Sequence, residues 1–134
     1  MQSTKKGVYS FRISMVKNDL DKLNHVNNIQ YLNWVLKASE EHWNFVTKKE
    51  YNSNYAWVVL RHEIDYLKSA MLNDKINITT WIKNIYGIKS ERIVYIKHNK
   101  KILVKAKTIW VFVNKKSMKP IRIPSAICKL FMVN

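Results

Sequence analysis

Glycine, proline and cysteine are all scarce in this chain of 134 residues, which contains two glycines, two prolines and one cysteine. With glycine only at positions 7 and 87, the sequence has no glycine-rich phosphate-binding loop and no nucleophile elbow. The single cysteine, Cys128, cannot form an internal disulfide and lacks the cysteine and histidine spacing of a zinc site. The scarcity of glycine therefore excludes glycine-rich phosphate-binding loops and a nucleophile elbow. The single cysteine is expected to be a buried or partly buried thiol.

Long apolar runs are missing as well. The longest, residues 56–60 and 109–113, are far shorter than the roughly 18 to 20 residues that a membrane-spanning helix needs. Residues 1–7 do not lead into the apolar core of a signal peptide, so we expect a cytoplasmic protein. A chain of 134 residues with 47% hydrophobic content can bury one substantial core, which predicts a single domain over residues 1–134.

Acidic residues are few, because 9 aspartates and glutamates stand against 24 lysines and arginines, giving a net charge of +15. Such a balance favours polyanionic partners, although drift toward a lysine-rich composition explains it as well. The lysines occur as scattered pairs at expected strand ends and turns, not as one basic helix or block. This distribution argues against a dedicated nucleic-acid-binding domain.

The apolar pattern predicts a strand, a long helix and then a series of strands. Residues 8–15 alternate apolar and polar side chains with a period of two, as a half-buried strand does. Four further strands are expected at residues 55–67, 75–86, 91–98 and 101–114. Asn99-Lys100 suits a tight turn, because asparagine tolerates positive φ, and strands joined by short turns form an antiparallel sheet. The tail, residues 124–134, is expected to be a short closing segment.

Residues 28–46 are expected to form the helix. Two apolar rows follow helical spacing side by side, so the apolar stripe is wider than that of a surface helix. The first row consists of Leu32, Val35, Leu36, Ser39, Trp43 and Val46, and the second of Tyr31, Trp34, Ala38 and Phe45. We therefore predict an α+β fold in which a curved antiparallel sheet of about five strands wraps around a long central helix.

The segment before this helix, residues 19–28, brings two acids, an imidazole and several amides to the helix start. A helix N-terminus has backbone N–H groups without intrahelical partners and a partial positive charge, so it can stabilise an oxyanion. A nearby carboxylate can then act as base or nucleophile toward a carbonyl or thioester. The plainer interpretation is that Asn27 or Asn28 caps the helix while Asp21 and His25 lie in a solvated loop.

The order of residues from Asp19 to Trp34, D-x-D-x-x-x-H-V-N-N-x-x-Y-x-x-W, resembles the signature of single hotdog-fold thioesterases. These are the 4-hydroxybenzoyl-CoA thioesterase-like acyl-CoA hydrolases, to which acyl-ACP thioesterases are related. The resemblance continues through residues 63–66, Asp74, residues 108–111 and residues 120–124, and so covers nearly the whole chain. It implies the hotdog fold, in agreement with the apolar pattern.

The resemblance also implies roles for individual residues. Asp21 stands where the family has its catalytic carboxylate, which either attacks the thioester carbonyl or activates water as a general base. The oxyanion-binding backbone N–H falls near Asn28. His25 stands where acyl-ACP thioesterases have a catalytic histidine, so it polarises the water, orients Asp21, or serves only to shape the loop.

Three further residues are candidates for substrate binding. Asn24 and Asn27 can hydrogen-bond the carboxylate or the pantetheine amide, although helix capping and loop shaping explain them as well. Tyr31 is among the aromatic and apolar residues expected to line the acyl pocket. The resemblance implies neither a cofactor nor a metal.

Acidic pairs elsewhere offer alternative catalytic groups. Some hotdog enzymes place the catalytic acid within the helix, which here means Glu40 or Glu41, but adjacent acids more often form a solvated face. Glu63 and Asp65 lie two apart on an expected strand and so share one side of it. Basic residues flank them, and we expect ion pairs there in preference to acid–base chemistry.

Assembly and function leave several possibilities open. An isolated curved sheet has open edges, so we expect at least a homodimer, with a homotetramer also possible, and in the family the active sites lie at this interface. The leading hypothesis is hydrolysis of acyl-CoA in fatty acid metabolism, with acyl-ACP as the near variant. A non-catalytic protein that binds acyl thioesters and a basic nucleic-acid-binding domain are the alternatives. Coenzyme A phosphates and acidic carrier proteins both suit the positive charge.

Overall fold

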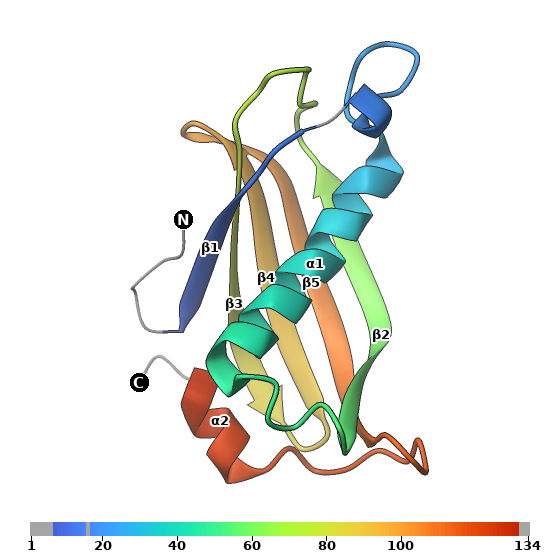
Figure 1. Cartoon of the computed structure of the whole chain (residues 1–134), viewed down its shortest axis with the longest axis vertical. Helices are drawn as coiled ribbons and strands as arrows, with labels where there is room; N and C mark the ends of the chain where they lie inside the picture. Colours follow the sequence, from blue (N-terminus) through green and yellow to red (C-terminus); the bar gives the residue numbers. More distant parts are fainter. Residues whose placement is uncertain (1–6, 16, 132–134) are drawn as a thin grey trace.

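A five-stranded antiparallel sheet curves around one long helix in the computed structural model of this chain, which describes residues 7–15 and 17–131 (Figure 1). The sheet order is β1-β3-β4-β5-β2, and every neighbouring pair is antiparallel. The predicted α+β architecture is therefore confirmed. In chain order the elements are β1 (Val8–Ile13), the 3₁₀ turn η1 (Lys17–Asp19), α1 (Asn28–Thr47), β2 (Tyr55–Tyr66), β3 (Ile76–Tyr86), β4 (Lys89–His98), β5 (Lys101–Asn114) and α2 (Ser125–Phe131).

Helix α1 crosses the concave face of the sheet and is capped at both ends. The Asn27 side chain accepts a hydrogen bond from the Ile29 N–H, and Lys48 ends the helix in the left-handed conformation. The buried face consists of Tyr31, Trp34, Val35, Ala38, Ser39, His42, Trp43 and Thr47. This is a wide stripe, as predicted, because sheet residues cover the helix along much of its length.

Phe45 was predicted to belong to the buried stripe, and this prediction is wrong. Its side chain is 48% exposed. Phe45 packs on Tyr9 of β1, with ring centroids 5.2 Å apart. Since β1 is an edge strand, no further strand of the described sheet covers the other side of the ring.

The strands bury alternate residues against α1, as the period of two predicts. On β3 the buried set is Ile76, Ile78, Thr80 and Ile82, and on β4 it is Ser90, Arg92, Val94 and Ile96. Asn99 has a φ of 55°, which confirms the predicted tight turn between β4 and β5. β1 ends earlier than predicted, at Ile13, and β4 begins earlier, at Lys89.

The closing segment after residue 124 contains a short helix, α2, that the sequence did not predict. Only Ile127 and Phe131 of its seven residues are buried, so its periodicity is too brief to detect. Phe131 stacks on Trp43 of α1 with ring centroids 5.7 Å apart. This helix therefore closes one end of the core, where Cys128 is partly buried as expected.

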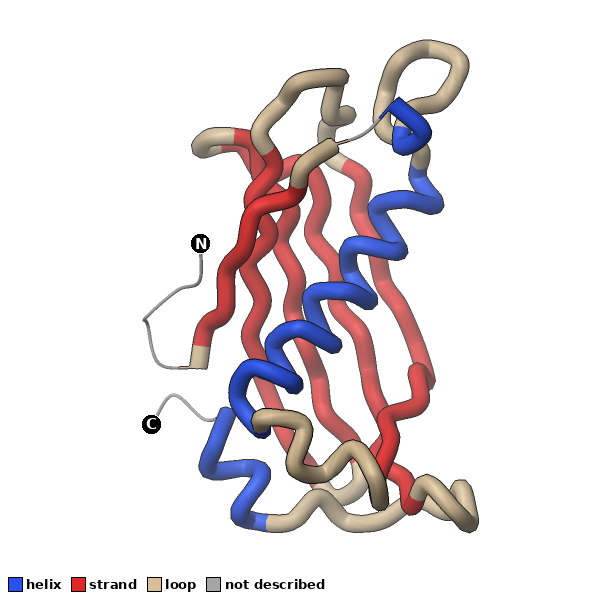
Figure 2. Tube along the Cα trace, in the orientation of Figure 1, coloured by secondary structure: helices blue, strands red, loops and turns tan. Residues whose placement is uncertain are grey.

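The loops gather at the two ends of the sheet (Figure 2). One end holds the connection from β1 to α1, the connection from β2 to β3, and the turn from β4 to β5. The antiparallel register places these together, because Ile13 pairs with Ile76, Ile76 pairs with His98, and Tyr66 pairs with Val104. The end of the sheet that carries residues 19–28 is therefore built from three separate segments.

Candidate functional site

The loop before α1 folds back on itself. The Asp21 N–H donates to the His25 carbonyl at 2.7 Å, and the Asn27 N–H donates to the Asp19 carbonyl at 2.8 Å. Leu20 and Val26 form an isolated antiparallel bridge between these two bonds. The loop thereby holds Asp21 close to the first residues of α1.

The Asp21 carboxylate is exposed and anchored at one oxygen. Its Oδ1 accepts hydrogen bonds from the backbone N–H groups of Leu23 at 2.8 Å and His25 at 3.1 Å. Its Oδ2 makes no hydrogen bond to any residue in the described part of the chain. One oxygen therefore fixes the orientation of the group and the other is left for a ligand.

The start of α1 offers a free backbone donor. The Asn27 side chain takes the Ile29 N–H at 2.9 Å, while its carbonyl accepts from Gln30 and Tyr31. The Asn28 N–H has no partner among residues 7–15 and 17–131. Such unpaired N–H groups at a helix start, together with the helix dipole, favour negative charge.

Tyr31 lies in the core beneath this loop. It is 2% exposed, and its hydroxyl accepts the Ala70 N–H at 2.8 Å. The Ala70 carbonyl in turn accepts the Val26 N–H at 3.0 Å, and His25 forms a bridge with Met71. Burial is the main reason that the pKa of Tyr31 is raised, so its hydroxyl stays neutral. Tyr31 therefore ties the β2–β3 connection to the loop that carries Asp21.

The main candidate residues predicted from the sequence all lie in the loop before α1 or in its first two turns, and several of them have structural roles there. Asn27 is the N-cap, and Asn24 adopts a left-handed φ of 61° within the loop, so both have the shaping roles considered above. His25 is half-buried in the same loop. Asn28 is exposed at the first turn of α1. A substrate-binding role for these side chains stays a prediction.

A separate cavity of about 510 Å³ lies between the later turns of α1 and the sheet, near the first residues of β2. Aromatic side chains form much of its wall, and Ser39, Ser90 and Arg92 are its inner polar lining. The aromatic wall consists of Trp43, Tyr55, Trp57 and Trp110. No residue of the 19–28 loop lines this cavity.

Arg92 is buried beside this cavity. It is 4% exposed, and its Nη1 donates to His42 Nδ1 at 2.8 Å and to Thr80 Oγ1 at 3.0 Å. Because arginine has only donors, the His42 Nδ1 must be the acceptor, and the imidazole is neutral. Burial and the neighbouring guanidinium lower the pKa of His42 to about 3. Burial lowers the pKa of Arg92 to about 9, which leaves it charged at neutral pH.

Neither His42 nor Arg92 was predicted from the sequence as a functional residue. A signal for each was present. His42 follows Tyr31, Val35 and Ala38 at helical spacing, and Arg92 is one of the alternating buried residues of its strand. Buried charged residues are rare, and for that reason their positions carry information.

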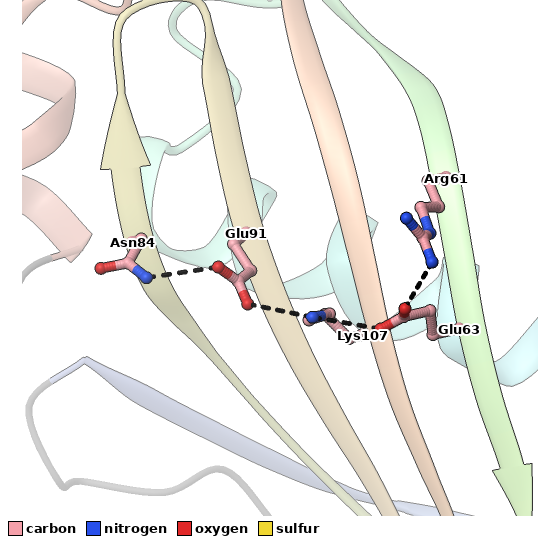
Figure 3. Close-up of polar contacts among 5 residues, drawn as sticks. All are labelled: Arg61, Glu63, Asn84, Glu91 and Lys107. Atoms are coloured by element: carbon pink, nitrogen blue, oxygen red, sulfur yellow. Dashed lines mark hydrogen bonds and ion pairs between the residues drawn. The ribbon is translucent and has the colours of Figure 1, made fainter.

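Of the two acids expected to form ion pairs on β2, Glu63 does so, whereas Asp65 has no ion pair among the described residues. Figure 3 shows Glu63 between Arg61, at 2.7 Å, and Lys107, at 3.1 Å, with Lys107 also 3.7 Å from Glu91. The hydrogen bond from Lys107 and its charge lower the pKa of Glu63. This row lies on the face of the sheet turned away from α1, so the predicted ion pairing of Glu63 is confirmed.

The acids within α1 are also accounted for. Glu41 pairs with Lys37 at 3.8 Å and accepts the Tyr9 hydroxyl at 3.4 Å. Glu40 is exposed, at the edge of the cavity. Within residues 7–15 and 17–131 no three histidine, cysteine, aspartate or glutamate side chains lie close enough together to hold a metal ion. Neither helix of the described chain is long and apolar enough to cross a membrane.

Comparison with known families identifies the chain. Residues 6–131 match the family model described as the acyl-ACP thioesterase N-terminal domain. The chain belongs to this thioesterase family. No curated protein matches its sequence.

Solved structures confirm the fold of this thioesterase domain. A thioesterase from Thermus thermophilus, solved with coenzyme A and zinc, superposes with a TM-score of 0.82 at 22% identity, covering 96% of this chain and 94% of the other. A predicted thioesterase from Bacillus stearothermophilus gives 0.83 at 22% identity, covering 92% and 93%. A 1,4-dihydroxy-2-naphthoyl-CoA thioesterase from Synechocystis gives 0.77 at 16% identity, covering 92% and 95%. Because all three structures are less than 25% identical to this chain, the comparison supports a shared fold and nothing more specific.

Proposed function

We propose that this domain hydrolyses acyl-CoA thioesters, with Asp21 as general base or nucleophile and the N-terminus of α1 as the oxyanion hole. The observation that carries the proposal is the state of Asp21. Two backbone N–H groups anchor Oδ1, while Oδ2 has no partner among the described residues and the side chain is exposed. A carboxylate held in this way is oriented for attack or for proton abstraction.

Two routes are open to Asp21. As a nucleophile, its Oδ2 adds to the thioester carbonyl carbon, the C–S bond breaks, the thiolate takes a proton from solvent, and water then hydrolyses the mixed anhydride. As a base, Asp21 takes a proton from water while the water oxygen attacks the same carbon, and the proton passes to the leaving thiolate. His25 is available to polarise that water.

Both routes place negative charge on the thioester carbonyl oxygen. The unpartnered Asn28 N–H and the dipole of α1 supply a donor and a favourable potential for that charge. Because the backbone fixes this donor, it needs no rearrangement during the reaction. The loop bonds between Asp21 and His25 and between Asp19 and Asn27 keep the acid and the donor on neighbouring segments.

Several lysines lie at this end of the molecule. Exposed lysines come from each of the three segments that meet there: Lys22, Lys68, Lys75, Lys100 and Lys101. The phosphates of coenzyme A and the acidic surface of an acyl carrier protein are both attracted to such a rim. The family match favours acyl-ACP as the alternative substrate. A cytoplasmic location, expected from the sequence, belongs to this proposal.

The free edge of β2 fits a homodimer. β2 is twelve residues long, pairs with β5 alone among the described strands, and exposes Val58 and Leu60. A long unpaired strand edge with exposed apolar residues favours pairing with another strand. Antiparallel pairing with a second β2 brings the Tyr55 end of one subunit beside the Tyr66 end of the other. The cavity of one subunit then lies near the Asp21 loop of its partner.

Turnover by an Asp21→Asn variant tests the proposal. We expect the wild type to release thiol from at least one acyl-CoA in a panel from acetyl to palmitoyl with one aromatic member. Asp21→Asn is expected to lower kcat by about a hundredfold to ten-thousandfold while acyl-CoA still binds. Asp65→Asn, which changes an exposed aspartate on β2, is the matched control and keeps full turnover.

Other outcomes lead elsewhere. Equal turnover by Asp21→Asn and wild type removes Asp21 from the mechanism. If no acyl-CoA is cleaved, the same variants are assayed with acyl carrier protein thioesters, and release there establishes the alternative substrate. Binding of both carriers without release from either supports the non-catalytic hypothesis.

A further inference from the structure

The cavity beside α1 contains an uncompensated positive charge. Arg92 is 4% exposed, and among residues 7–15 and 17–131 no carboxylate forms an ion pair with it. Its two hydrogen-bond partners, His42 and Thr80, are both neutral. A buried charge without a counter-charge is costly, and proteins normally pair it.

The guanidinium has donors left for a ligand. Both bonds use Nη1, whereas Nε and Nη2 have no partner among the described residues. Arg92 lines the cavity, so these donors belong to its wall. The indole N–H of Trp110, which lines the same cavity, is buried and also lacks a partner in the described chain. The Ser90 hydroxyl adds a further polar group.

Much of the rest of the wall is aromatic or aliphatic, and the further polar lining residues are Ser39, Glu40, Asn44, Asn52 and Lys115. Leu36, Trp43, Trp57 and Ile82 line the cavity together with these polar groups. A fitting ligand therefore has an apolar body and one compact anionic end. A carboxylate matches the planar fork of the arginine side chain. It also carries the single negative charge that would compensate Arg92. A phosphate, with its larger hydration, suits an apolar cavity less well.

We propose that this cavity binds the carboxylate of an apolar carboxylic acid, with Arg92 as the residue that recognises it. Two sources share this chemistry. One is a free fatty or aromatic acid, such as a hydrolysis product. The other is the distal carboxylate of an acyl group whose thioester lies at Asp21 of the partner subunit, and this second source rests on the proposed function.

Binding of a matched pair of ligands tests the site without any turnover. Decanoate and decanamide share an apolar chain and differ in charge at one end. Because Trp43, Trp57 and Trp110 line the cavity, tryptophan fluorescence reports occupancy, and calorimetry supplies an independent affinity. At pH 7 we expect the wild type to bind decanoate about tenfold or more tightly than decanamide, since the charge-assisted bonds form only with the acid.

Substitutions then assign the preference to Arg92. Arg92→Met is expected to abolish the preference for decanoate and to leave decanamide affinity nearly unchanged. Arg92→Lys is expected to retain part of it, because the charge remains but the bidentate fork is lost. Arg12→Met is the matched control, since Arg12 is exposed on β1, and it keeps the wild-type preference.

Two results would overturn the proposal. One is equal affinity of the wild type for decanoate and decanamide, which is measured without any variant and so does not depend on how well Arg92→Met folds. The other is an Arg92→Met protein that keeps the preference.

Turnover separates the two sources of the carboxylate. If the ligand is an acyl group, decanedioyl-CoA is cleaved with a higher kcat/KM than decanoyl-CoA, and Arg92→Met removes this difference. If carboxylates bind and decanoyl-CoA is favoured, the site holds free acids. If carboxylates bind and no thioester is cleaved, the proposed function fails while the cavity proposal stands.

Discussion

Arg92 of β4 donates a hydrogen bond to Nδ1 of His42 across 2.8 Å, which joins the sheet to the later turns of α1. The bond exists only with a neutral imidazole, since protonation of Nδ1 would set two donors against each other. His42 is 2% exposed, so a second buried charge there would also lack solvation. This contact therefore couples the packing of α1 on the sheet to pH.

Acid should destabilise the protein through His42. Its pKa is about 3 in the folded chain, against 6.5 as the ordinary value, so between these values the unfolded chain binds a proton that the folded chain does not. The contribution of His42 to the free energy of unfolding is full above pH 6.5 and decreases as the pH falls. At pH 5 this loss is about 2 kcal/mol. Denaturant unfolding at several pH values measures the slope.

His42→Asn separates this effect from other titrations. The asparagine carbonyl can still accept from Arg92 but does not titrate. The variant is expected to lose less stability than the wild type between pH 6.5 and pH 5. If the unfolding free energies of the two proteins fall equally with pH, the acid destabilisation does not come from His42.

Removing the helix cap should weaken both the fold and the proposed site. Asn27→Ala leaves the Ile29 N–H without its partner, which costs about 1 kcal/mol of unfolding free energy. Asn27→Asp keeps an acceptor and is expected to retain wild-type stability. Asn33→Ala, at an exposed position within α1, is the control and should not destabilise. Thermal unfolding and thiol release are measured on the same samples, and an unaffected Asn27→Ala would contradict the capping role.

The main architecture could be predicted from periodicity alone. The alternation of residues 8–15 and the helical rows between Tyr31 and Trp43 are long enough for burial to decide the element. α2 could not be found in this way, because two buried side chains in seven residues do not establish a period. Phe45 was misplaced because helical phase does not reveal where a sheet ends.

The candidate site was predictable in part. The close spacing of Asp21, His25 and Asn28 in the sequence predicted that they lie at one helix start. The hydrogen bonds between Asp21 and His25 hold the loop in that position. The support of that loop by Tyr31 and Ala70 was not predictable, because it joins residues 39 apart in sequence. The pairing of His42 with Arg92, 50 residues apart, was invisible for the same reason.

Removing the Tyr31 hydroxyl should loosen the support of the Asp21 loop. Tyr31→Phe keeps the ring in the core but leaves the buried Ala70 N–H unpaired, at a cost of about 1–3 kcal/mol. Hydrogen exchange is expected to accelerate at Ala70 and Val26, and kcat to fall. Tyr66→Phe changes an exposed tyrosine and is expected to leave both unchanged. Unaltered exchange at Ala70 in Tyr31→Phe would show that the hydroxyl does not hold this segment.

Charge on the β2 edge should separate subunits if the proposed dimer forms there. Leu60 is 57% exposed at the irregularity between Val59 and Arg61, and a lysine there would place a charge inside the paired edge. Sedimentation velocity is expected to show a dimer for the wild type and a monomer for Leu60→Lys. Leu130→Lys introduces the same charge on α2, at a leucine that is 41% exposed, and should remain dimeric.

The activity of the Leu60→Lys monomer then decides where the site lies. If the cavity of one subunit serves Asp21 of the other, turnover is lost with the dimer and returns as rising protein concentration restores association. A monomer that hydrolyses acyl-CoA at the wild-type rate would confine the site to one chain. A wild type that sediments as a monomer would reject the β2 interface itself, because the free edge would then be stable in water without a partner strand.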